Sequence, residues 1–495
     1  MKMIQDPSCN SPRAWQIVAL LVLTVLSGCA VGPDYQRPEA TTIPATYTGV
    51  SDEWKIAVPQ AHLPKGNWWE VFGDDELNRL EAEATAANQD LKAAAARFEQ
   101  ARALVDVAQS GLFPRLGISF QPVWQHDSIN RPAGGHPGQT YDTYTVPFDL
   151  SYELDLWGRI RRTIESATAQ AQASADDVES VRLAIQAEVA ADYFAVRTLD
   201  ADKALLLSSI HVYHRSFKLV RDRRAGGMVS DLDVAQSETV LKTTEAQLPD
   251  TVLQRAKFEH ALAVLTGNNA SLFRLEERPL DLGLFTIPSD LPSELLERRP
   301  DIAAAERRMA SANANIGVAK AAFFPTIRFS GQAGLQSGDM GTLFNWPSRL
   351  WAAGPSLSQP LFEGGRLTAN LRQAKAAYEE TVAKYRGTVL AAFADVENNL
   401  AAEHLLTSEY EKALAASQSA RKQLKIADNR YRAGLVTYLD VATAENVALG
   451  TERTSVRLRG QQLVAIVALI KSLGGGWQAA DLSNSVQFQS SRREP

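Results

Sequence analysis

The chain has 495 residues, of which 45% are hydrophobic and 22% are charged, and its formal net charge is −6 at pH 7. The length suggests about three domains, the composition is that of an ordered protein, and the acidic balance argues against a nucleic-acid surface. After residue 29, no stretch approaches the roughly 18 apolar residues that a membrane helix needs.

The chain begins with a targeting signal. A diluted basic region precedes the apolar core Ile17–Leu26, which is too short to span a bilayer. The following Leu-Ser-Gly-Cys ends at Cys29 and resembles the lipobox of bacterial lipoproteins, in which a lipid-modified cysteine becomes the new N-terminus. An ordinary signal peptide with an incidental cysteine is the alternative. We expect residues 1–28 to be removed and Cys29 to carry acyl chains such as palmitate, two or more of which anchor stably.

The predicted processing bears on the membrane to which the protein is sorted and on the fate of its two cysteines. Ala30 is not the Asp that commonly retains lipoproteins at the inner membrane, so outer-membrane sorting is favoured. Removal of the signal also removes Cys9, and acylation uses the other cysteine, so the mature chain has no disulfide. The covalent lipid is the only non-protein group that we expect, and no cofactor is implied.

The remaining chain is internally duplicated. Residues 88–113 and 299–324 align at an offset of 211, and both place large apolar residues every seven positions with Ala three positions later. This spacing predicts two heptad helices whose small seam residues permit close approach. Each helix should end before a proline, Pro114 or Pro325, because proline disfavours helix in the residue before it.

Alternating apolar and polar residues follow each proline and predict strands. We expect strands over 115–124 and 143–154 in the first half, and over 327–336 and about 354–362 in the second. Their length and alternation match a transmembrane β-barrel. A small soluble sandwich, which would also have one apolar face, is the alternative.

Four strands cannot close a barrel alone. Open edges are not tolerated in lipid, and barrels start at about eight strands. The barrel must therefore be shared among copies, with two giving eight strands and three giving twelve. The interior of an eight-stranded barrel is largely filled by side chains, so a conduit favours three or more copies.

A very long helix follows each strand pair. Residues 159–225 contain no Pro or Gly, and residues 367–433 contain one Gly and no Pro, so each could extend about 100 Å. Both end at similar motifs, RAGGMVSDLDVAQSE from Arg224 and RAGLVTYLDVATAE from Arg432. One further helix should then return in each half.

Several motifs, in order along nearly the whole mature chain, resemble the outer membrane factors, the TolC/OprM/NodT-type efflux lipoproteins. They are CAVGPDYQRP (29–38), WWEVFGDDELNRLEAEA (68–84), LPSELLERRPDI (291–302), PLFEGGRL (360–367) and the two motifs above. The resemblance implies an α+β membrane protein whose long helical hairpins form a periplasmic α-barrel. It also implies a homotrimer in which four transmembrane β-strands per chain build a shared 12-strand β-barrel.

The resemblance implies a function as well. The expected protein is a porin-like exit duct of a tripartite efflux system in the outer membrane of a Gram-negative bacterium, extending into the periplasm. It would passively conduct drugs or other small molecules, with a periplasmic membrane-fusion adaptor and an inner-membrane pump of the RND type as partners, and it would not be an enzyme. A duct for type I polypeptide secretion and a lipid-anchored periplasmic coiled-coil scaffold are the alternatives.

The expected domain organisation has six segments. They are a lipoprotein signal peptide (1–28), an N-terminal equatorial segment (29–87), repeat 1 (88–266), an equatorial linker (267–298), repeat 2 (299–473) and a C-terminal equatorial tail (474–495).

The two turn motifs share the chemistry of helix ends. A glycine can end the long helix in the left-handed conformation, a hydroxyl residue can cap the next helix, and an Asp three positions later suits a capping box. These residues are Gly226-Gly227, Ser230 and Asp233 in repeat 1, and Gly434, Thr437 and Asp440 in repeat 2.

By position, the resemblance implies a periplasmic gate at the second motif. Asp440 matches a pore-facing carboxylate, and three copies would form a ring that attracts cations. Leu439 matches the apolar part of the gate. Thr443 stands where the family often has a second acidic residue, so we expect only one carboxylate ring.

The resemblance also implies a latch and a docking surface. Asp233 and Tyr431 match partners in a latch between the hairpins, which we expect to be weaker here because Val436 replaces a basic residue that is sometimes used. The residues expected to dock the adaptor, which also suit turn geometry, are Gly226, Val229, Gly434 and Val436.

No enzyme signature is present, since the sequence contains no P-loop, HExxH or CxxC motif. His211 and His214 have a helical spacing that can ligate metal. Because neither Cys nor further His lies near them in sequence, we expect a solvated helix face and no metal site.

Overall fold

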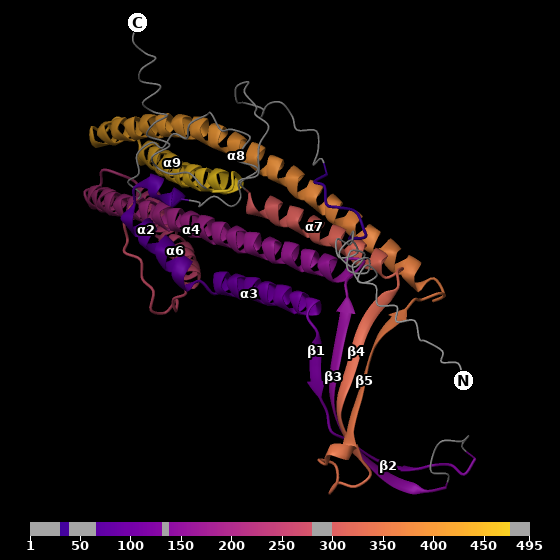
Figure 1. Cartoon of the computed structure of the whole chain (residues 1–495). Coiled ribbons are helices and arrows are strands. Elements are labelled where there is room, and N and C mark those ends of the chain that lie inside the picture. Colours follow the sequence, from indigo (N-terminus) through magenta and orange to yellow (C-terminus); the bar gives the residue numbers. More distant parts are fainter. Residues whose placement is uncertain (1–29, 39–65, 131–137, 280–298, 476–495) are drawn as a thin grey trace, which may run out of the picture. The chain divides into compact units, whose positions relative to one another are not determined.

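The computed structural model describes residues 30–38, 66–130, 138–279 and 299–475, which form long helices and one antiparallel sheet (Figure 1). The signal peptide and Cys29 lie outside these ranges. The chain divides into two units, and each unit draws on both sequence repeats. Of the described residues, the first comprises 30–38, 98–130, 138–173 and 305–385, and the second comprises 66–97, 174–279, 299–304 and 386–475.

The two longest helices confirm the sequence prediction, since α4 and α8 each span 67 residues. The helices are η1 (Trp68–Phe72), α2 (Asp75–Ala87), α3 (Gln89–Gln109), η2 (Ser110–Leu112), α4 (Arg159–Ala225), α5 (Asp231–Glu245), α6 (Leu248–Leu265), α7 (Pro300–Ala321), η4 (Trp346–Ser348), α8 (Arg366–Arg432) and α9 (Tyr438–Ser472).

The return helices of the two repeats differ. The second repeat has the single helix that we expected, α9, but in the first repeat the chain breaks between α5 and α6. Pro249 lies at the start of α6. Proline has no backbone N–H, and its ring clashes with the carbonyl four residues earlier, which here belongs to Glu245, the last residue of α5. The expectation of one continuous helix was therefore wrong in repeat 1.

The strands form one antiparallel sheet in the order β1-β3-β4-β5, with β2 also paired to β3 (Figure 1). The last strand lies earlier than the predicted 354–362, because its alternation ends before Pro360, which cannot donate to a strand ladder. The strands are β1 (Arg115–Ile118), β2 (Gln121–His126), β3 (Thr140–Leu154), β4 (Thr326–Ser337) and β5 (Arg349–Ser358).

β1 and β2 are two parts of the first predicted strand, since both pair with β3 in one continuous register. The interruption at Ser119 and Phe120 lies opposite Pro147, which has no N–H to donate. On its other side, Pro147 pairs with Gly334. A Cβ at Gly334 would lie 2.2 Å from the Val146 carbonyl oxygen, so the close approach of the two backbones requires glycine.

The two faces of the sheet differ in polarity, as the alternation predicted. One face exposes Ile118, Phe148 and Trp351, which lie in one row across the sheet. The other face carries polar pairs, such as Gln332 Nε2 donating to Asp149 Oδ1 at 3.2 Å. Within the described ranges, no helix is long and apolar enough to cross a membrane.

In the second unit, η1 and α2 pack against α4 and α9 through a core that includes Trp68, Leu80, Phe194 and Ile466. Asp74 caps α2 by accepting from the Glu76 N–H at 3.0 Å. The core therefore joins helices of both repeats to the segment before the first repeat.

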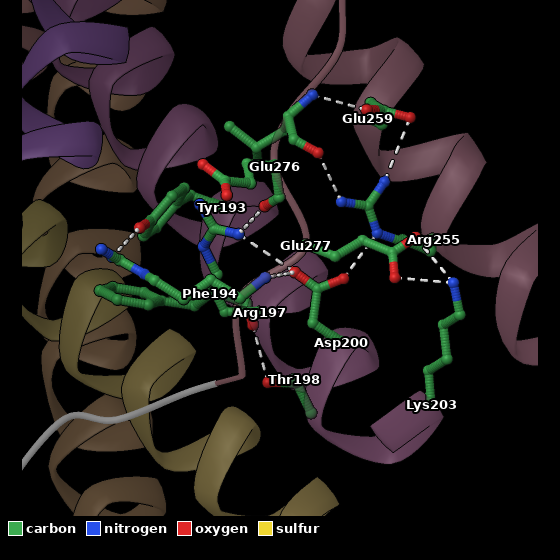
Figure 2. A network of polar contacts seen from close by, with 12 residues as sticks. Tyr193, Phe194, Arg197, Thr198, Asp200, Lys203, Arg255, Glu259, Glu276 and Glu277 are labelled. Atoms are coloured by element: carbon green, nitrogen blue, oxygen red, sulfur yellow. Dashed lines mark hydrogen bonds and ion pairs between the residues drawn. The ribbon is translucent and has the colours of Figure 1, made fainter. Parts of the chain in front are cut away.

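A buried ion network fastens the chain after α6 to α4 (Figure 2). Asp200 is 4% exposed and accepts from Arg255 at 2.6 Å and Arg197 at 3.1 Å. Arg255 also pairs with Glu259 at 3.2 Å, and Glu259 Oε1 accepts from the Leu275 N–H at 2.7 Å. Because the carboxylates face guanidinium groups and backbone donors, the cost of burying these charges is offset.

Glu81 on α2 is also buried, but unlike Asp200 and Glu259 it lacks partners in the described part of the chain. Its side chain is 0% exposed, and neither carboxylate oxygen has a hydrogen-bond partner among the described residues. Burial raises the pKa of Glu81 well above its ordinary value, so the folded chain holds it as a neutral acid.

We predict that Glu81→Met stabilises the protein by about 1–3 kcal/mol at pH 8, since it removes an unsatisfied buried group. The unfolded chain releases this proton near pH 4.5, whereas the folded chain retains it. Stability therefore falls as pH rises above that value, and the gain from the substitution is smaller at pH 4.5. Thermal unfolding in detergent at both pH values measures the effect, with the half-exposed Glu83→Gln as control. A lower Tm for Glu81→Met at pH 8 would contradict the prediction.

Candidate functional site

The chain reversals between α4 and α5 and between α8 and α9 carry the predicted gate, latch and docking residues, and we call residues 223–233 and 430–443 the tip. The two reversals line one groove of about 690 Å³. The predicted residues that line it are Val229, Asp233, Tyr431, Gly434 and Val436. The gate residues Leu439, Asp440 and Thr443, and the docking residue Gly226, are not among its lining residues.

Both long helices end in the same left-handed glycine turn. The φ angle is 73° at Gly227 and 74° at Gly434. In the first turn Met228 N–H donates to the Arg223 carbonyl at 2.9 Å, and in the second Leu435 N–H donates to the Arg430 carbonyl at 2.9 Å. These bonds are those of the Schellman motif and confirm the predicted helix ends.

The caps of the two return helices differ, although the sequence predicted similar ones. Ser230 forms a complete capping box with Asp233. Thr437 caps no backbone amide through its side chain, and its hydroxyl donates to Asp440 Oδ2 at 3.1 Å. The predicted box is therefore absent in repeat 2. The side-chain bond does not explain this difference, since the Ser230 hydroxyl also donates to Asp233 Oδ2, at 2.7 Å.

The predicted gate residues lie on one exposed side of the first turns of α9. Leu439 is 55% exposed, and Asp440 and Thr443 are also exposed. Their neighbours Tyr438 and Val441 are 1% exposed. The gate side chains are thus available to a solvent-filled space, and their role in a pore remains a prediction.

The predicted latch partners share the groove without a direct hydrogen bond among the described contacts. Asp233 Oδ2 accepts from the Ser230 N–H at 2.9 Å. Tyr431 is 5% exposed, and its hydroxyl has no hydrogen-bond partner in the described part of the chain. Burial raises the pKa of the Tyr431 hydroxyl, and the charge of Asp233 adds to this.

Arg223 forms a link between the reversals that sequence reasoning missed. It extends from the last turn of α4 and donates to the carbonyls of Tyr431 at 3.2 Å and Arg432 at 3.1 Å. Its guanidinium lies 4.9 Å from the centre of the Tyr431 ring. It therefore satisfies carbonyls that the end of α8 leaves open, and its charge suits a helix C-terminus. The basic last turn of α4 was the available signal.

A second missed cluster lies beneath the tip. Glu445 of α9 is 3% exposed, and its Oε2 accepts from the Tyr438 hydroxyl at 3.0 Å. Ser216 Oγ lies 3.2 Å from the same hydroxyl, and the Tyr213 hydroxyl donates to the Glu445 carbonyl at 3.0 Å. Burial raises the pKa of Glu445 to about 7. A glutamate in a helical sequence gives no signal that it is buried.

The segment 30–38, directly after the predicted lipidation site Cys29, is held within the first unit. Val31 N–H donates to the Trp157 carbonyl at 3.0 Å, near the end of β3. Three further bonds fasten the segment: Arg162 Nη2 to Asp34 Oδ1 (2.7 Å), Asn313 Nδ2 to the Pro33 carbonyl (3.0 Å) and Arg37 Nη2 to the Tyr385 hydroxyl (3.0 Å).

The two histidines that were considered as metal ligands, His211 and His214, are both exposed on α4. The residues that the structure describes contain no group of three or more His, Cys, Asp or Glu arranged to hold a metal ion.

Comparison with known proteins gives consistent matches over most of the chain. A family model described as outer membrane efflux protein matches residues 80–268 and 291–475. Outer membrane protein OprJ of Pseudomonas aeruginosa is 33% identical over 474 residues, which cover 94% of this chain and 96% of that protein. The toluene efflux pump outer membrane protein TtgF of Pseudomonas putida is 32% identical, covering 93% and 96%. The solved outer-membrane channel OprN matches with a TM-score of 0.83 and 31% identity, covering 91% of this chain and 100% of that one.

The unequal caps predict unequal responses to alanine. Ser230→Ala should cost about 1 kcal/mol of local stability at the start of α5, because the hydroxyl accepts from the Asp233 N–H. Thr437→Ala should change the start of α9 much less, because Thr437 caps no amide. Hydrogen–deuterium exchange of the two first turns measures this difference. Equal acceleration in the two variants would show that the caps are equivalent.

Proposed function

The chain belongs to the outer membrane efflux protein family and is an outer-membrane exit duct of an efflux system, and from this premise we propose that three copies form one channel. The channel conducts drugs or other small molecules passively to the exterior. It catalyses no reaction, and an inner-membrane pump of the RND type supplies the energy. The observation that carries the proposal is the amphipathic sheet with open edges.

The sheet supports a shared barrel. Within the described ranges its outermost strands, β1 and β5, each pair with one other strand, and β2 extends the position of β1. In lipid these edges must be paired, and four strand positions from each of three copies give a twelve-stranded barrel. The face with Phe148 and Trp351 would contact lipid, and the face with Asp149 would line the lumen.

The helices of three copies would form the periplasmic α-barrel, with the tip as its gate. Leu439, Asp440 and Thr443 would face the pore, and the three Asp440 carboxylates would form one ring that concentrates cations. Asp233 and Tyr431 would act as a latch when the gate is assembled. Their shared groove supports this assignment, since it places both residues between the two reversals.

The periplasmic adaptor would dock at the tip, at Gly226, Val229, Gly434 and Val436. Three of these line the groove, and Gly226 is the sequence neighbour of the lining residue Gly227. Acyl chains on Cys29 would enter the inner leaflet of the outer membrane. The bond between Val31 and Trp157 supports this placement, because it holds the neighbouring residues near the end of a barrel strand.

Planar-bilayer recording together with native mass measurement tests the proposal. Purified full-length mature protein should give single-channel conductance, and its mass in detergent should be that of a trimer. A monomeric mass without conductance would contradict the channel and favour a periplasmic scaffold.

Asp440→Asn should weaken both the cation preference of the channel and its block by multivalent cations, because it removes the proposed carboxylate ring. Reversal potentials in a KCl gradient and block by hexamminecobalt measure the two effects. Asp231→Asn is the matched control, since this tip aspartate is 83% exposed and lies outside the proposed gate. Unchanged block in Asp440→Asn would remove this residue from the pore.

A further inference from the structure

A buried polar chain joins the two hairpins below the tip. It runs from Ser216 of α4 through the Tyr438 hydroxyl to the Glu445 carboxylate of α9. Tyr213 of α4 adds a bond to the Glu445 backbone carbonyl. Two of these bonds, Ser216–Tyr438 and Tyr213–Glu445, join opposite sequence repeats and hold one hairpin to the other. The Tyr438–Glu445 bond lies within α9.

The surroundings of this carboxylate are apolar or acidic. Tyr213 and Tyr438 belong to a buried apolar cluster to which α5 contributes Val240 and Leu241. α4 contributes the Tyr213 and Ser216 hydroxyls, and the carboxylate of Asp428 on α8 acts on Glu445 through its charge. In the described part of the chain, no lysine or arginine pairs with Glu445.

An ionised carboxylate is costly in such a place, because no cation compensates it. The neutral acid fits better, since it carries no charge and can still bond to the Tyr438 hydroxyl. Burial raises the pKa of Glu445 to about 7, and the Asp428 charge adds to the effect, whereas the bonds from Tyr438 and Ser216 oppose it. Near neutral pH, the protonated and the ionised forms of Glu445 are therefore both populated.

We propose that Glu445 is a positioning residue of the gate, which holds α9 against α4 when it is protonated and loosens this contact when it is ionised. The gate residues Leu439, Asp440 and Thr443 lie on the same helix, within two turns of Glu445, so a change in the seating of α9 moves them. This inference rests on the proposed channel function. It assigns pH sensing to a buried group rather than to the exposed carboxylate of the pore.

The direction in which pH shifts the docking of the hairpins follows from proton linkage. When the hairpins separate, Glu445 is hydrated and ionises near pH 4.5, but when they are docked it ionises near pH 7. The docked state therefore binds more protons between these values. Its separation becomes more favourable as pH rises, by at most tenfold per pH unit for each chain. Above about pH 8, both states are ionised and the effect reaches a plateau.

Single-channel recording from pH 5 to pH 8 at fixed salt tests the inference. Wild-type open probability should rise with pH and level off above about pH 8. Glu445→Gln keeps a neutral hydrogen-bonding group, so it should lower the rise at least threefold. Glu238→Gln, on the exposed side of α5, is the matched control and should keep the wild-type profile.

A second variant guards against a folding defect in the first. Tyr438→Phe removes a hydrogen bond that stabilises the ionised carboxylate, so it should move the plateau to higher pH without abolishing the rise. Hydrogen–deuterium exchange of the α4 and α9 backbone amides near Glu445, measured in detergent and corrected for intrinsic rates, should show the same pH dependence as the open probability of each variant.

The outcomes distinguish a failure of the proposed channel from a failure of the proposed role of Glu445. Absence of conductance in wild-type protein would overturn the proposed channel. Conductance with the same pH profile in wild type and Glu445→Gln would overturn the role of Glu445 and leave the channel intact. A plateau that does not move in Tyr438→Phe would also contradict it.

Discussion

The organisation of the tip depends on how an α-helix ends, because its last four carbonyls have no partners within the helix. α4 and α8 meet this constraint with the left-handed glycines Gly227 and Gly434, and α8 has additional donors from Arg223. The place of each reversal then sets where the following helix begins. Packing of α9 against α4 leaves Asp440 exposed and Glu445 buried.

The second unit buries carboxylates in two contrasting ways. Asp200 and Glu259 are surrounded by guanidinium groups and backbone donors (Figure 2). Glu81 has no partner among the described residues, and Glu445 has hydroxyl partners only. The first arrangement fastens the segment after α6 to α4. A buried carboxyl without a cation makes the stability of its surroundings depend on pH.

Local patterns in the sequence predicted the long helices and the two-faced sheet, because heptads, alternation and the absence of proline act over a few neighbouring residues. The gap between β1 and β2 could not be predicted this way, since its cause, Pro147, lies on the partner strand. Pro249 was a local signal for the break in the return helix of repeat 1. At the candidate site, the glycine turns were predictable, but the bond between Thr437 and Asp440 and the burial of Glu445 depend on side-chain rotamers and tertiary packing.

The two hairpins are similar in sequence but not equivalent in structure. One has a full capping box and a return helix broken before Pro249, and the other has an open cap and a continuous return helix. A closed ring of such chains has only as many equivalent positions as it has copies, although it has twice as many hairpins. In the proposed channel, the groove within a chain and the groove between neighbouring chains would therefore be different surfaces. A partner protein would then need two distinct contact faces, or it would occupy only every second groove.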